Sequence, residues 1–176
     1  LEDLTDGDYY IYNIETGTWI GDNYTNTTRY TSRAELGARG SDFYVSAITG
    51  GYQINPKLGH NHSLNASNLY MDTTSGLTKW VITPVEGSFN IFTITSGSYT
   101  LGADATGLLI NNASSKNTWQ FVSREERLLV DCRNASMDSP VDLSWAVYGG
   151  TFPVADERRN LWQGAWGSNN VRGDDL

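Results

Sequence analysis

The chain has 176 residues, of which 18% are charged, and its formal net charge is −8. This acidic balance, without any basic run, argues against binding to a nucleic-acid backbone or to an anionic membrane surface. The single cysteine excludes an intrachain disulfide, and no apolar run reaches the roughly 18–20 residues that a membrane-spanning helix needs. The length allows one substantial core with at most a small appendage.

Three segments open alike, each with a glycine followed by a strand in which aromatic and isoleucine side chains alternate with polar ones. They are Gly7–Ile11, Gly51–Ile54 and Gly87–Ile91. Their starts lie 44 residues apart (51 minus 7) and then 36 residues apart (87 minus 51). This spacing indicates an internal repeat of about 40 residues.

Two aromatic landmarks recur within these units. One stands at the start of the last strand of each unit, and the other stands on a short strand closely followed by Gly or Asp. The first set is Phe43, Trp80 and Trp119, and the second is Trp19, Tyr70 and Tyr99. Because each landmark recurs at one place in its unit, we expect all six side chains to pack in a core or a barrel cap rather than to bind a ligand.

Three units with four short strands each predict an all-β fold, a β-trefoil over residues 1–123. In such a fold six strands close a barrel, and three hairpins cap one end. A three-stranded meander or an irregular sandwich is the alternative. The middle unit departs from the pattern, because residues 56–68 lengthen its first hairpin.

A helix follows the last unit. Ser123 and Glu126 are spaced as a capping box, and good helix formers continue after them. The apolar residues Leu128, Leu129, Cys132 and Ala135 have helical spacing, so we expect them to form the buried stripe and Cys132 to be a small buried hydrophobe. The residue before Pro140 is pushed out of the α region. We therefore predict a helix over 124–137 in a linking segment, 124–139, that packs on the trefoil.

Residues 140–176 contain three tryptophans, Trp145, Trp162 and Trp166, and two glycine-rich turns. This is too much aromatic surface for a tail and too little chain for a domain. We expect the start of a truncated further domain, or an irregular tail.

The pattern Ile11 to Gly17-x-Trp19-Ile20 and the closing segment Asn117–Trp119 resemble the ricin-type carbohydrate-binding β-trefoil. That family usually has Gln two residues before the closing aromatic, whereas this chain has Ser41, Thr78 and Asn117. The stretches beginning at Ser123, at Pro140 and at Gly150 are similar to secreted multidomain proteins of gut bacteria. There a trefoil-like domain and a helix precede a galactose-binding-like sandwich. This resemblance implies a carbohydrate-directed protein, secreted or at the cell surface.

The ricin-type resemblance also implies where a sugar would bind. In that family an Asp near the end of the second strand accepts hydrogen bonds from sugar hydroxyls, an aromatic ring stacks on the sugar, and an Asn or Gln completes the site. The corresponding candidates are Asp22, Asp72 and Asp104, with Asp72 the best match, and Asn111 or Asn112 as polar partners. The competing interpretation is that an Asp after a short strand caps a turn.

No catalytic motif stands out. The sequence has no nucleophile elbow and no phosphate-binding glycine loop. His60 and His62 would point the same way on a strand, but no further zinc ligand is obvious, so we expect neither a metal nor a cofactor.

We therefore expect a non-catalytic, lectin-like carbohydrate-binding module with glycans as partners. We expect a monomer that neither binds nucleic acid nor inserts into a membrane. The first residues, LEDLTDGDYY, lack the features of a signal peptide, yet the resemblance implies an extracellular or cell-surface location. The alternative is a structural spacer without a working sugar site that presents a downstream domain. A third hypothesis, a protein-binding trefoil of the cytokine or inhibitor type, is disfavoured by the scarcity of Lys.

Overall fold

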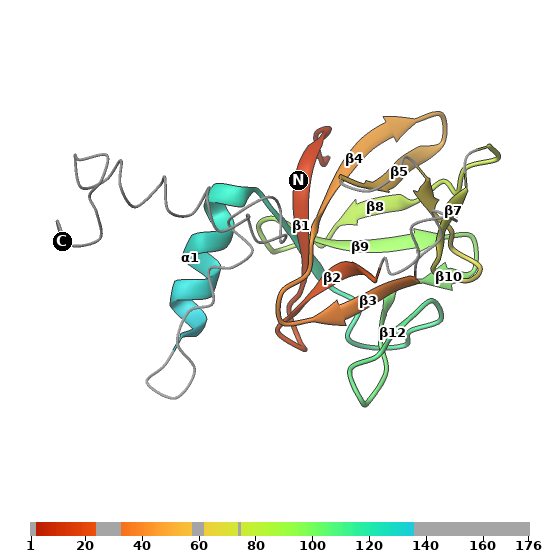
Figure 1. The fold of residues 1–176 in the computed structure, drawn as a ribbon. Coiled ribbons are helices and arrows are strands. Elements are labelled where there is room, and N and C mark those ends of the chain that lie inside the picture. Colours follow the sequence, from red (N-terminus) through yellow and green to blue (C-terminus); the bar gives the residue numbers. More distant parts are fainter. Residues whose placement is uncertain (1–2, 24–32, 58–61, 74, 136–176) are drawn as a thin grey trace, which may run out of the picture.

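The computed structural model describes residues 3–23, 33–57, 62–73 and 75–135. The described part is mostly β, with one helix (Figure 1). The elements are β1 (Gly7–Asn13), β2 (Thr18–Asn23), β3 (Arg33–Gly37), β4 (Asp42–Ile48), β5 (Gly51–Pro56), β6 (Ser63–Leu64), β7 (Met71–Thr73), β8 (Val81–Pro84), β9 (Ile91–Ser96), β10 (Tyr99–Thr100), β11 (Gly102–Ala103), β12 (Leu109–Ile110), β13 (Trp119–Val122) and α1 (Arg124–Asn134). His60 and the tryptophans Trp145, Trp162 and Trp166 lie outside the described residues.

The strands form one curled nine-stranded sheet and two small hairpin sheets, β6–β7 and β11–β12. The central strand is β1, which pairs antiparallel with three others. Its first half pairs with β4, its second half pairs with β13, and its last two residues also pair with β2. On the far side of β13 the sheet continues with β9, which pairs with both β8 and β10. Segments far apart in sequence therefore meet at β1.

The predicted strand starts are correct for two of the three units. Strand β1 begins at Gly7 and β5 begins at Gly51. The third start is wrong, because β9 begins at Ile91 and the residues from Gly87 to Asn90 form a turn instead. Gly87 and Asn90 both have positive φ, +81° and +65°, which an extended strand does not allow.

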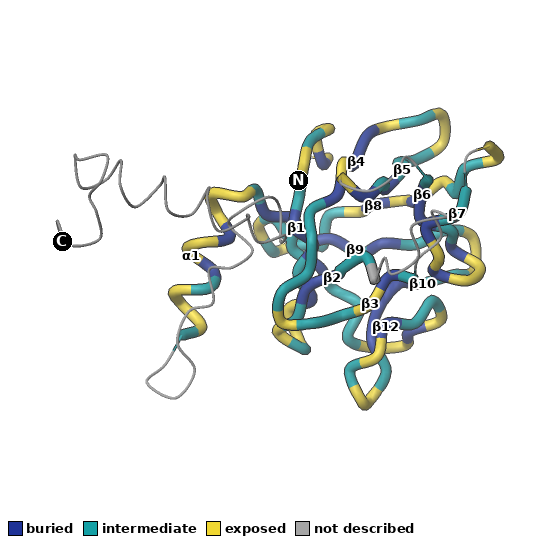
Figure 2. Tube along the Cα trace, in the orientation of Figure 1, coloured by how far each residue is buried: buried dark blue, intermediate teal, exposed yellow. Residues whose placement is uncertain are grey.

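The closing aromatics Phe43, Trp80 and Trp119 are confirmed as core residues, each with 0% exposed surface in one shared cluster. Trp80 donates its indole N–H to the Leu64 carbonyl at 3.1 Å, and Trp119 donates to the Leu101 carbonyl at 3.0 Å. Figure 2 shows buried stretches within β1, β4 and β9. The buried indole N–H groups are thus paired, as burial requires.

The second aromatic set behaves less uniformly. Trp19 is buried, and Tyr99 packs at the edge of the core, but Tyr70 is 41% exposed. Tyr70 precedes β7, the second arm of the hairpin β6–β7, whereas Trp19 lies on β2, the first arm of its hairpin. The inward positions beside Tyr70 belong to Leu69 and Met71, which are buried. The expectation that Tyr70 is a core residue equivalent to Trp19 is therefore wrong.

Helix α1 begins with the predicted capping box, in which Ser123 N–H donates to Glu126 Oε1 at 2.9 Å and Glu126 N–H donates to Ser123 Oγ at 3.2 Å. It ends at Asn134, three residues before the predicted end at 137. The helix stands at one side of the sheet and contacts β1 and β13 (Figure 1). No described helix is long and apolar enough to cross a membrane.

The predicted buried stripe of this helix is wrong. Leu128 and Leu129 are 43% and 68% exposed, and Cys132 is exposed too. The inward residues are Val130 and Arg127, which is only 1% exposed. The Arg127 guanidinium lies 4.7 Å from the ring centroid of Tyr10 and 4.2 Å from that of Trp19. Since Arg has an apolar stem and a planar charge that stacks on aromatic faces, it takes the place that the pattern assigned to Leu.

Candidate functional site

Asp22 lies in a shallow pocket of about 340 Å³ beside strands β2 and β3. The pocket is lined by Gly21, Asp22, Glu35, Leu36, Gly37, Ala38, Arg39, Gly40 and Ser41. Strand β3 brings one wall close, because Gly21 pairs with Glu35 and Asp22 pairs with Ala34. The connection from β3 to β4 supplies the other wall.

That second wall approaches closely because Gly40 has no side chain. A Cβ on Gly40 would lie 2.5 Å from Trp19 Cβ and 2.9 Å from the Ile20 carbonyl oxygen, and its φ of +64° also favours glycine. The approach lets Ser41 N–H donate to the Ile20 carbonyl at 3.1 Å. Asp22 N–H in turn donates to Ser41 Oγ at 3.2 Å. Backbone packing thereby fixes Ser41 next to Asp22.

The pocket combines acceptors, donors and a small apolar surface. Asp22 and Glu35 bring carboxylate acceptors, Arg39 brings guanidinium donors, and Leu36 brings apolar surface. This mixture suits an uncharged ligand with several hydroxyl groups, which need donors and acceptors side by side. No aromatic side chain is among the lining residues given above, so ring stacking is not supplied by this part of the wall.

Asp72 holds a turn together. Its two carboxylate oxygens accept hydrogen bonds from Asn65 Nδ2 at 3.0 Å and Asn68 Nδ2 at 2.9 Å. Asn111 reaches the same segment, since its Nδ2 donates to the Ala66 carbonyl at 2.7 Å and to the Ser67 carbonyl at 3.1 Å. The structure therefore brings Asp72 and Asn111 together around residues 65–68, in a network that ties two hairpins to each other.

Asp104 caps the turn between β11 and β12. Its Oδ1 accepts from Thr106 Oγ1 at 2.6 Å, from Thr106 N–H at 2.8 Å and from Leu108 N–H at 3.0 Å. The hydroxyl bond from Thr106, followed by the backbone bond from Leu108, lowers the pKa of Asp104 from its ordinary value. This matches the turn-capping interpretation. Asn112 is exposed and pairs with Thr100 in an isolated bridge.

A recurring hydrogen bond shows which residue of the second hairpin corresponds to Asp22. Ala66 N–H donates to Thr78 Oγ1 at 3.1 Å, as Asp22 N–H donates to Ser41 Oγ. Thr78 stands two residues before Trp80, and Ser41 stands two residues before Phe43. Ala66 therefore occupies the place matching Asp22, and Asp72 lies on the opposite arm of its hairpin. Asp72 thus differs in place from Asp22, which lies on β2, the first arm of its hairpin.

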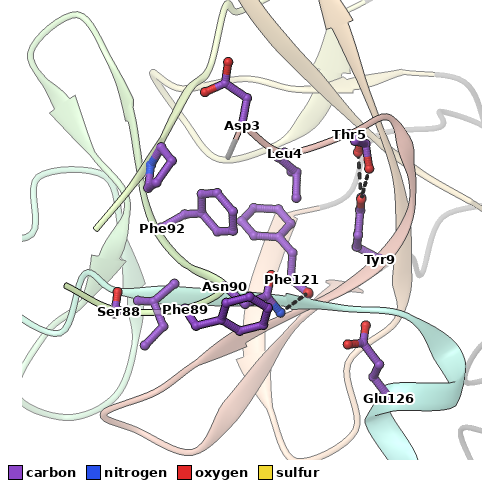
Figure 3. Close-up of a pocket in the computed structure, with 12 residues that line it drawn as sticks. Asp3, Leu4, Thr5, Tyr9, Ser88, Phe89, Asn90, Phe92, Phe121 and Glu126 are labelled. Carbon is purple, nitrogen blue, oxygen red and sulfur yellow. Dashed lines mark hydrogen bonds between the residues drawn. The ribbon is translucent and has the colours of Figure 1, made fainter. Parts of the chain in front are cut away.

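The largest cavity described was not found from the sequence. It has about 540 Å³ and lies between the N-terminal segment, the turn after β8, and the start of α1 (Figure 3). Phe89, at its edge, is 92% exposed. A signal for this turn exists in the sequence, because Phe89 stands between Gly87 and Asn90, two residue types common in turns, although the alternating pattern favours a strand.

No protein-family model matches the sequence, and no curated protein sequence matches it significantly. Solved structures do resemble it. A salivary protein of the Cysteine and Tryptophan-Rich family from Culex quinquefasciatus is 11% identical with a TM-score of 0.54, and the match covers 68% of this chain and 94% of that chain. A proteinase inhibitor from Coprinopsis cinerea is 15% identical with a TM-score of 0.53, covering 69% and 99%.

A third similar structure is SeviL bound to the asialo-GM1 saccharide. It is 18% identical with a TM-score of 0.50, and the match covers 68% of this chain and 98% of that chain. SeviL and the proteinase inhibitor have lectin-like folds of the β-trefoil type. At these identities the likeness concerns the fold alone. The β part of the chain therefore shares its fold with these structures.

Proposed function

We propose that residues 1–123 form a β-trefoil of three units that acts as a non-catalytic carbohydrate-binding module. The four-strand order from β1 to β4 is followed by a similar order from β5 to β8, and by five strands from β9 to β13, of which β10 and β11 are separated only by Leu101. The recurring core position of Phe43, Trp80 and Trp119 supports this reading. So does the likeness to SeviL, a structure determined with a bound saccharide.

In this proposal the sugar binds in the pocket at Asp22. The observation that carries it is that Asp22 lines a cavity, whereas none of the cavities described includes Asp72 or Asp104. Asp22 and Glu35 accept hydrogen bonds from sugar hydroxyls, and Arg39 donates to ring or hydroxyl oxygens. Leu36 and the glycine backbone meet the apolar C–H face of the sugar.

The other two carboxylates serve the fold in this proposal. Asp72 accepts two side-chain amides, and Asp104 accepts three donors of its own turn. Because neither of these two carboxylates lines a described cavity, the module is proposed to have one site, and Asn111 and Asn112 have no part in it.

The experiment compares glycan binding by the wild type and by Asp22→Asn, first on a glycan array and then by calorimetry with any glycan that binds. Asn keeps the size of Asp but removes a charged acceptor, so we expect affinity to fall about tenfold or more. Glu125→Gln removes a charge from the exposed first turn of α1 and is the matched control. Equal binding by the wild type and Asp22→Asn would refute this site, and binding lost equally in Asp72→Asn would refute the single-site assignment.

The second candidate is a spacer trefoil whose sugar site has been lost. It is favoured by the missing Gln before each closing aromatic and by the pocket lining, which includes no ring. This candidate predicts no binding to any glycan on the array. It also predicts that deleting the trefoil from a longer natural protein leaves adhesion to glycans unchanged.

We further propose that the protein is monomeric and works outside the cell or at its surface. Neutral, hydroxyl-rich ligands and an acidic chain suit that environment. Light scattering after size exclusion tests the monomer, and immunolabelling of intact against permeabilised cells of the natural source tests the location.

A further inference from the structure

The large cavity has an aromatic floor. The rings of Phe92 and Phe121 meet edge to face with centroids 5.5 Å apart, and Tyr9 meets Phe121 in the same way at 5.7 Å. Leu4 closes one side, and its carbonyl accepts a 2.7 Å hydrogen bond from Tyr52 Oη. A cavity of about 540 Å³ is within the size range of small-ligand sites.

One wall is an exposed phenylalanine that the backbone holds in place. The turn carrying Phe89 is closed by Val85 N–H donating to the Ile91 carbonyl at 2.8 Å. Asn90 stands at φ +65° and its Nδ2 donates to the Phe121 carbonyl at 3.3 Å. A well-braced turn therefore presents a large apolar ring to solvent, next to a cavity that also contains Phe92. This arrangement points to a ligand that covers the ring.

The polar groups that line the cavity indicate which charge a bound ligand would have. Tyr9 Oη donates to the Thr5 carbonyl at 2.7 Å and lies 3.2 Å from Thr5 Oγ1, and Ser88 Oγ donates to the Val85 carbonyl at 2.8 Å, so the three hydroxyl groups of the lining are paired within the chain. The charged side chains of the lining are the carboxylates Asp3 and Glu126, and Glu126 keeps its negative charge although its Oε1 also accepts the capping-box bond from Ser123 N–H at 2.9 Å. Figure 3 shows them at opposite ends of the cavity, with the rings of Phe92 and Phe121 between them.

We propose that this cavity binds a small organic cation with an apolar body, of the arylalkylammonium class. The apolar body enters the cavity beside Phe89, which is 92% exposed, and meets the edges of the largely buried rings of Phe92 and Phe121. The ammonium group lies near Phe89 or Tyr9 and one of the carboxylates. Aromatic faces and carboxylates both attract a cation. The net charge of −8 adds a favourable long-range field. The site is separate from the Asp22 pocket, with which it shares no lining residue.

The test is an NMR titration of the full chain with phenethylammonium, set against 2-phenylethanol as a neutral probe of similar size. Amide shifts at Phe89, Asn90 and Phe121 report binding at the cavity. We expect the ammonium to bind about fivefold or more tightly than the alcohol. Phe89→Ala should weaken ammonium binding about two- to fivefold and, since Phe89 is 92% exposed, should still fold.

Glu126→Gln is the second variant. Gln also serves at this position of a capping box, so the helix start is kept while the charge is lost. Glu126→Gln should weaken the binding of phenethylammonium and leave the binding of 2-phenylethanol unchanged. Glu125→Gln should change the affinity for neither probe. Equal affinity for the two probes would overturn the proposal, and so would unchanged ammonium binding in both Phe89→Ala and Glu126→Gln. Asp22→Asn should bind the ammonium normally, so failure here is distinct from failure of the sugar site.

Discussion

Trp119 donates its indole N–H to the backbone carbonyl of Leu101 at 3.0 Å, in the fully buried core. Trp80 makes the corresponding bond to Leu64 at 3.1 Å. In the first part of the chain Phe43 stands at the start of the matching strand and has no such donor. The core thus accepts either ring, but only the tryptophans satisfy a buried carbonyl.

Trp119→Phe should therefore destabilise the protein by about 2–4 kcal/mol. The change leaves the Leu101 carbonyl without its indole donor and removes buried ring volume. Urea unfolding measures the loss. Trp80→Phe is the matched variant and should cost a similar amount. A loss below about 0.5 kcal/mol for both would show that the indole bonds do not stabilise the fold.

Arg127→Ala should destabilise the protein by about 2–3 kcal/mol. The substitution removes the cation stacked on Tyr10 and Trp19 together with the buried stem of the side chain. Hydrogen exchange of the α1 amides should rise, because this contact attaches the helix to β1. Leu129→Ala is the control, since Leu129 is 68% exposed and should change stability by less than about 0.5 kcal/mol. A larger loss of stability for Leu129→Ala than for Arg127→Ala would indicate that the helix packs through its leucines instead.

Gly40→Ala should destabilise the protein more than Gly97→Ala. Both glycines have similar positive φ, +64° and +59°, so the backbone strain of an added Cβ is comparable. A Cβ at Gly40 would clash with Trp19 Cβ at 2.5 Å, whereas one at Gly97 would meet nothing within 4 Å. We expect Gly97→Ala to lower the free energy of unfolding by about 1 kcal/mol, and Gly40→Ala to lower it by at least about 2 kcal/mol more, as measured by urea unfolding. Equal losses would mean that the β3–β4 connection shifts freely.

The pH dependence of stability should change in Asp42→Asn. Burial is the main cause that raises the pKa of Asp42 above 3.8, while Lys57 lowers it and Asp8 raises it. A folded-state pKa above the unfolded value means that the folded state holds its proton longer. Asp42 therefore costs stability as pH rises through the interval above pH 3.8.

Removing the carboxyl should make the variant gain stability relative to the wild type as pH rises through that interval. Urea unfolding of both proteins from about pH 3 to pH 7 measures the difference. A difference that is constant over this range, or one that falls with rising pH, would contradict the prediction.

Sequence reasoning was most successful where a local pattern also determines the tertiary position. The capping box at Ser123 depends on residues three apart, so it was readable directly. The recurrence of a large aromatic residue at one strand start predicts that Phe43, Trp80 and Trp119 lie in the core, and the structure confirms this.

The errors have equally specific causes. Tyr70 is not the core residue that its position suggests, because the long segment before it conceals the short strand β6, of only two residues. Arg127 was overlooked because a hydrophobicity pattern treats a charged residue as outward-facing, and only the positions of Tyr10 and Trp19 explain its burial. The cavity beside Phe89 is lined by residues from the N-terminal segment, from the turn between β8 and β9, and from the end of β13 and the start of α1, and no local signal in the sequence brings these together.

The pairing of β1 also determines the order in which the strands can assemble during synthesis on the ribosome. Its first half can pair with β4 as soon as residue 48 has emerged, but Tyr10 to Asn13 must wait for Trp119 to Val122. Before β13 is synthesised, the second half of β1 has an unpaired edge where β13 will bind. On its opposite edge, the last two residues of β1 are already paired with β2. Closure of the sheet is thus coupled to nearly the whole described chain having been synthesised, and nascent chains that stall before β13 should be the species that recruit chaperones.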